Sequence, residues 1–229
     1  TVVIVGAVAL DSLRPLVERY VASLPTTGRV ERPRDLGVRP PAGRIERVVR
    51  RGLEPQASTS MVFTSDFDYT ADNRAALGAV AEVLTITLRE QLREALGATY
   101  GVGVGATAAK FPVQAASMYV SFGSAPDRAD ELAVRVLAAI DSLRAHGPSP
   151  EVLAKVKETM LRERETSLRE NRYWLDRIGG ALELGEDPRL LLGAESRIEA
   201  LTPERVQDAT RRWVHPGRFV RVTLVPEKR

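Results

Sequence analysis

The sequence of 229 residues contains no cysteine and only two histidines. The absence of cysteine excludes disulfide bonds, thiolate metal ligands and a cysteine nucleophile, but it is compatible with either the cytoplasm or the periplasm. His146 ends a predicted helix and His215 lies in a Pro-Gly turn, and neither has a second histidine or a glutamate at metal-ligand spacing. A G-x-S-x-G nucleophile elbow is also missing. The sequence therefore predicts no metal site and no complete catalytic site in this chain.

Long apolar runs and clusters of one charge are missing as well. No apolar run approaches the roughly 20 residues that a membrane-spanning helix needs. The 33 basic and 30 acidic residues nearly cancel, and arginines alternate with glutamates along the predicted helices. Nucleic-acid binding favours clustered positive charge and aromatic residues interleaved to stack on bases, and the sequence has neither pattern. We therefore expect no membrane span and no nucleic-acid partner.

A change in composition divides the chain near its beginning. Residues 26–43 are rich in proline, glycine and charge, without apolar periodicity, and this predicts a linker rather than a long surface loop. The apolar run at 2–5 predicts a buried strand, and Asp11 is a candidate cap for the helix that follows. Because the chain opens in what looks like the middle of a strand, we interpret it as a piece of a longer precursor.

Beyond the linker, the apolar patterns predict one domain at 44–229. Strands joined without an intervening helix must lie antiparallel if they pair with each other. We therefore expect an α+β fold, with a largely antiparallel sheet covered on one face by helices. The expected strands are 45–51, 58–67, 100–106, 113–122 and 219–225. The expected helices are a long one that ends at Leu96 and is capped by Thr70 or Asp72, one at 127–146, and further helices after Ser149, Glu170, Asp187 and Thr202.

The segment around residues 88–106 carries the most informative pattern. The long helix stops at Gly97, a residue suited to a helix C-cap, and in the strand that follows apolar residues alternate with glycines. The turn can bring the guanidinium of Arg93 close to the phenol of Tyr100, and together these donors can hold a peptide carbonyl. The alternative interpretation is a surface arginine and a half-buried sheet tyrosine. The glycines at 101–105 follow a helix rather than a strand, which argues against a phosphate loop.

Several segments resemble the C-terminal, non-zinc half of the pitrilysin/insulinase family of zinc metallopeptidases. LREALGATYGVGVGA is similar to the family's Leu-Arg-Glu…Leu-Gly-x-x-Tyr segment, and it is the most specific part of the resemblance. The opening TVVIVGAVALDSLRPLVERYVASLP resembles the strand and helix that close the preceding half, although Ala7 stands where the family often has aspartate. RENRYWLDRI resembles the bacterial, periplasmic-type members, and the terminal helix, turn and strand are similar too.

The resemblance implies a clamshell of two α+β halves around a chamber. A zinc-bearing N-terminal half, in the same precursor or a separate subunit, would carry an H-x-x-E-H motif and the zinc, whereas this chain would hold no cofactor. Arg93 and Tyr100 match the substrate-binding pair in type and spacing, and would bind peptide substrates. The glycines after Tyr100 would keep the chamber wall low or let a helix pack closely. The alternative is a non-catalytic scaffold or assembly subunit of the same fold.

Overall fold

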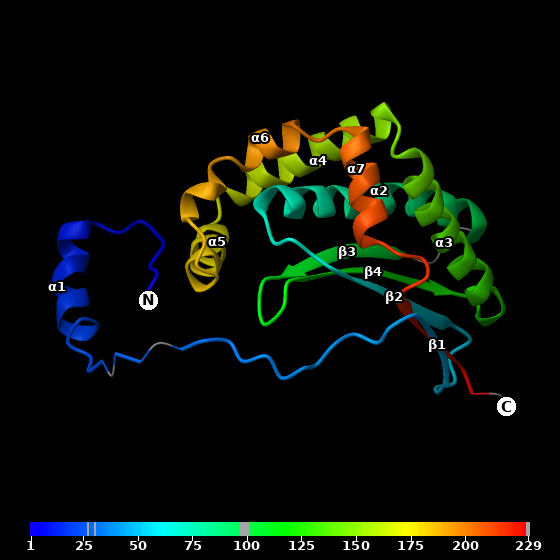
Figure 1. Ribbon diagram of the computed structural model, residues 1–229, viewed down its shortest axis with the longest axis horizontal. Helices are drawn as coiled ribbons and strands as arrows, with labels where there is room; N and C mark the ends of the chain where they lie inside the picture. The colour runs from blue at the N-terminus through cyan, green and yellow to red at the C-terminus, as the bar shows by residue number, and fades with distance from the viewer. Residues whose placement is uncertain (27, 30, 97–100, 228–229) are drawn as a thin grey trace.

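The computed structural model of the protein describes residues 1–26, 28–29, 31–96 and 101–227. Its centre is a five-stranded sheet in the order β1-β5-β2-β4-β3, covered on one face by helices (Figure 1). All pairings are antiparallel except that between β1 and β5, so the expected α+β fold is confirmed. The strands are β1 (Arg44–Arg50), β2 (Ala57–Asp66), β3 (Val102–Ala109), β4 (Ala115–Ser124) and β5 (Phe219–Val225).

Some of the helices begin at a residue whose side chain caps the first turn. Thr70 accepts from the backbone N–H of Asn73 at 3.1 Å, and Ser149 accepts from that of Val152 at 3.2 Å, so each satisfies an unpaired donor of a first helical turn. Asp187 caps only a short 3-10 helix. The helical elements are α1 (Leu10–Tyr20), α2 (Ala71–Leu96), η1 (Pro126–Arg128), α3 (Ala129–His146), α4 (Pro150–Ser167), α5 (Asn171–Glu183), η2 (Pro188–Leu191), α6 (Ala194–Glu199) and α7 (Pro203–Trp213).

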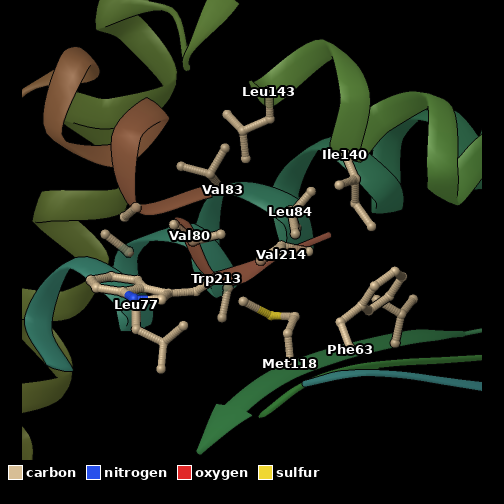
Figure 2. Packing of buried hydrophobic residues seen from close by; sticks show 14 of the residues in the cluster. Phe63, Leu77, Val80, Val83, Leu84, Met118, Ile140, Leu143, Trp213 and Val214 are labelled. Carbon is tan, nitrogen blue, oxygen red and sulfur yellow. The ribbon is translucent and has the colours of Figure 1, made fainter. Parts of the chain in front are cut away.

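The main core lies between the sheet and the long helix α2 (Figure 2). Phe63 of β2 and Phe219 of β5 lie side by side in the sheet, with ring centroids 5.3 Å apart. The side chains of Val80 and Leu84 on α2 are fully buried against them, as the helical spacing predicts. Trp213 at the end of α7 closes the same cluster. Burial of this apolar face is the principal source of stability for the helix layer.

The segment before the linker differs from the sequence prediction. Residues 2–5 form no strand, and Val2 is 62% exposed. The prediction of a buried strand there is wrong for this chain because a strand needs a neighbour for its backbone hydrogen bonds, and residues 2–5 have none among the described strands. α1 begins at Leu10 rather than after Asp11, and none of its residues is buried. Figure 1 shows it apart from the sheet, at the end of an extended segment.

The linker assignment leads to a proteolysis prediction. Because Arg29 and Arg34 are exposed and neither precedes a proline, trypsin should cut there first under native conditions. Arg32 and Arg39 both precede proline and should be cut more slowly. The fragment from Asp35 onward should keep the melting temperature of the whole chain, as measured by circular dichroism. Loss of its cooperative transition would show instead that the first 25 residues belong to the same core.

Candidate functional site

The predicted pair Arg93 and Tyr100 lies where α2 ends and β3 begins. α2 ends at Leu96 and β3 starts at Val102, so the structure confirms the helix followed by a strand. Tyr100 and the side chain of Arg93 lie outside the described residues. Their mutual approach therefore stays a prediction.

In β3 the apolar residues lie on one face of the sheet and the glycines on the other. Val102, Val104 and Ala106 pack against the core under α2, whereas the intervening glycines lie on the face without helices. The suggestion that the glycines let a helix pack closely is therefore wrong, because α2 contacts the opposite face of the strand. On the helix-free face, a Cβ added at Gly105 would lie 2.2 Å from the ring of Tyr119.

Tyr119 is a residue that the sequence patterns did not single out. It lies directly opposite Gly105 in the β3–β4 pairing, and its ring extends across the backbone of that glycine. The side chain is 44% exposed. A cross-strand signal was present, since a glycine opposite an aromatic residue is a recognised pairing, but it becomes visible only once the register is known. Tyr119 and Gly105 continue into an apolar row across the sheet, formed by Val62, Val220 and Ile45.

The turn between β3 and β4 is held from two sides. Lys110 donates its ammonium hydrogen to the carbonyl oxygen of Leu184 after α5, with 2.8 Å between Nζ and O. Gln114 accepts a hydrogen bond from the backbone N–H of Tyr69, just before α2, at 2.7 Å. Arg74 on α2 then forms two hydrogen bonds with the half-buried carboxylate of Glu186, at 2.9 and 3.0 Å. The hairpin that contains β3 is thus fixed against α2 and the segment after α5.

The charged helix α4 does not form a basic surface. Arg162 pairs with Glu158 at 2.6 Å, one turn away along the helix, as the alternation of charges predicts. Where α4 faces α2, burial raises the pKa of the Glu82 carboxyl, the negative charge of Glu163 raises it further, and Arg89 acts in the opposite direction. These charges lie on the helix layer, away from the helix-free face of the sheet that carries Tyr119.

The described residues form neither a metal-binding cluster nor a membrane-spanning helix. In the ranges that the structure describes, no three histidine, cysteine, aspartate or glutamate side chains come together in a way that could hold a metal ion. His215 uses its ring Nε2 for a hydrogen-bonding contact of 2.9 Å with the carbonyl oxygen of Arg212. Over the same ranges, no helix has the length and apolar character needed to cross a membrane.

Comparison with proteins of known fold gives consistent results. The "periplasmic protease PqqL" of Escherichia coli superimposes with a TM-score of 0.78 at 23% identity, over 97% of this chain and 25% of that one. A protease of Helicobacter pylori gives a TM-score of 0.80 at 15% identity, over 97% of this chain and 54% of that one. At these identities the likeness establishes the fold.

Sequence comparison identifies the family. A "zinc protease PQQL-like" protein of Arabidopsis thaliana is 32% identical over 120 residues, which cover 48% of this chain and 13% of the plant protein. The chain thus matches only a small part of this longer relative. Residues 1–160 match the family described as the peptidase M16 inactive domain. The chain therefore belongs to this family, as a domain of the pitrilysin-type zinc peptidases that does not itself carry the active site.

Proposed function

We propose that this chain is the substrate-binding half of a zinc endopeptidase and is inactive without a partner half that carries an H-x-x-E-H zinc site. The observation that supports this most directly is the match of residues 1–160 to the inactive domain of a peptidase family. Arg93 and Tyr100 provide what such a half would contribute. They are the two donors that the family resemblance leads us to expect for a peptide carbonyl, in the sequence between the long helix and β3.

In the proposed mechanism, the H-x-x-E-H residues of the partner half would hold the zinc, which would supply an activated water, and this chain would bind the substrate. The guanidinium of Arg93 stays charged at all working pH values and would hold the peptide carbonyl before and during the reaction. The phenol O–H of Tyr100 would donate to the carbonyl oxygen as negative charge develops on it. A donor that acts mainly on the developing charge lowers the barrier to reaction more than it tightens binding.

The first 25 residues would complete the partner half. Val2, Leu10 and Tyr20 are exposed by 62%, 76% and 63%, which leaves an apolar surface on α1 and the segment before it. Burial of such a surface is favourable, and a strand at 2–5 would gain the backbone partners that it lacks here. Residues 26–43 would then connect this preceding half to the domain that begins at Arg44.

The proposal is tested with the purified chain and a separately expressed zinc half. The chain alone should bind no stoichiometric zinc by elemental analysis and should not cleave a quenched fluorescent peptide. Addition of the zinc half should give turnover that chelators abolish. One zinc per chain, or cleavage by the chain alone that survives further purification, would contradict the proposal. A stable but inactive complex with a zinc-loaded half would favour the scaffold alternative.

A further inference from the structure

The two edges of the sheet have very different sequences. β1 forms one edge and pairs only with β5, and it carries charged side chains at Arg44, Glu46, Arg47 and Arg50. β3 forms the other edge and has the sequence VGVGATAA, without a charge or a proline. Proteins commonly protect edge strands from unwanted pairing with charges, prolines or bulges. By this comparison, β1 is protected and β3 is not.

The backbone of β3 is also regular enough to accept another strand. Its register with β4 runs without interruption from Val102 opposite Phe122 to Ala109 opposite Ala115, so no bulge turns the edge away. Among the described strands β3 pairs only with β4, which leaves the backbone N–H and C=O groups of alternate residues directed outward. Gly103 and Thr107 are exposed. An unprotected, straight and firmly held edge is the structure to which an extended peptide adds as a further strand.

The helix-free face beside this edge carries glycines, one aromatic ring and small hydroxyl side chains, with Ser121 opposite Gly103. Gly103 and Gly105 carry no side chains there, and the ring of Tyr119 lies across Gly105. Because the end of that ring lies over Gly105, the ring is next to the position that an added strand would take. A side chain of the added strand would find an aromatic contact at Tyr119, beside Gly105.

We propose that β3 binds an extended segment of the peptide substrate as an additional strand, with Tyr119 contacting a substrate side chain over the glycines. This inference rests on the proposed peptidase function and deepens it. β3 starts two residues after Tyr100 in the sequence, which links this edge to the proposed carbonyl-binding segment. The absence of charge on β3 favours segments rich in uncharged, β-branched or aromatic residues.

The first test uses the unaltered 229-residue chain. The probe is a fluorescein-labelled peptide of alternating valine and threonine with a lysine at each end, and its binding is followed by fluorescence anisotropy. Single N-methyl groups are then placed at each peptide residue in turn. Strand pairing uses every second peptide N–H, so methylation should weaken binding roughly three- to tenfold at alternate residues and little at the others. Absence of saturable binding, or equal effects at all positions, would overturn the proposal.

The second test places a charge on the edge. Thr107→Lys should weaken peptide binding severalfold because it puts a solvated ammonium group beside the added strand. Thr64→Lys is the matched control. Thr64 and Thr107 both pair with Ser117 of β4, in the same row and on the same face, but Thr64 lies in an interior strand. Equal weakening by both variants would overturn the assignment to the β3 edge. Thermal melting shows whether both variants fold. If either variant does not fold, the methylation series on the unaltered chain decides whether a peptide pairs with a strand edge.

A third measurement addresses a different occupant and the link to function. A dimer seen in sedimentation that Thr107→Lys disrupts, without peptide binding, would show that β3 pairs with a second copy and would overturn the proposal. In the reconstituted enzyme, Thr107→Lys should raise KM for the probe peptide and leave kcat nearly unchanged. If KM and kcat for the probe peptide are unchanged by Thr107→Lys, this inference is wrong but the proposed peptidase function is not affected. If methylation weakens binding at alternate peptide residues but the reconstituted enzyme shows no turnover, the β3 edge binds peptide and the proposed peptidase function is wrong.

Discussion

Tyr100→Phe is expected to lower kcat by about 10²–10³-fold in the enzyme reconstituted from both halves. The change removes only a hydroxyl group, and a donor to the developing oxyanion stabilises the transition state more than the bound substrate. KM should therefore change much less than kcat. Steady-state kinetics on a quenched peptide, beside thermal melting of the same preparation, measures both effects. Tyr69→Phe removes the same atom from a partly buried side chain just before α2, outside the proposed site, and serves as the matched control.

Arg93→Ala is expected to lower kcat/KM through both parameters. A guanidinium that holds the substrate carbonyl contributes before the reaction as well as during it, so KM rises while kcat falls. Arg89→Ala, an exposed position four residues earlier on α2, is the matched control. Near-normal kcat/KM for Tyr100→Phe and for Arg93→Ala would refute the proposed roles. A large fall in melting temperature would assign these residues to folding instead.

Most secondary structure in residues 44–229 was predictable because its signals are local. The strand at 219–225 was predicted with the observed bounds, and α2 follows Thr70, one of its two predicted caps. Its burial follows from spacing alone, since Leu77 and Leu88 recur on one helical face and are buried as predicted. Side-chain caps before α4 and α7 act within three residues of the helix start. Such information is contained in short windows of sequence.

The order of the strands was not predictable in the same way. β1 and β2 follow one another in the chain, so they would be expected to pair as a hairpin. In the structure the last strand, β5, lies between them. It pairs in parallel with β1 and antiparallel with β2. Side-chain contacts hold β5 against β2. The buried hydroxyls of Thr59 and Thr223 lie 3.2 Å apart, and the ring of Phe63 packs on that of Phe219. Contacts between residues so distant in sequence leave no periodic signal in either segment.

The candidate site also combines residues that local sequence reveals with one that depends on contacts between strands. Arg93 and Tyr100 were identified from spacing within one segment and from the family resemblance, both of which a single sequence can provide. Tyr119 required the register between β3 and β4, because its ring matters only where it crosses Gly105. The strand predicted at 2–5 was wrong for a related reason. An apolar run indicates burial, but residues 2–5 have no pairing strand among the described residues.

Phe63→Ala is expected to cost about 3–5 kcal/mol of folding free energy, the largest stability effect expected from a single core substitution here. Phe63 is fully buried, packs on Phe219 with ring centroids 5.3 Å apart, and belongs to the interior strand β2 that joins the two sides of the sheet. Neighbouring strands cannot move inward without losing their own register, so a cavity should remain after truncation.

Phe111→Ala deletes the same side chain from the turn before β4, where Phe111 is 45% exposed, and should change stability by less than about 0.5 kcal/mol. For a chain of this length each kcal/mol corresponds to roughly 2–4 °C, so Phe63→Ala should lower the melting temperature by roughly 6–20 °C. Urea denaturation followed by circular dichroism measures both variants. Similar small effects would mean that the core collapses around the missing ring, and that the contact with Phe219 does not hold the sheet together.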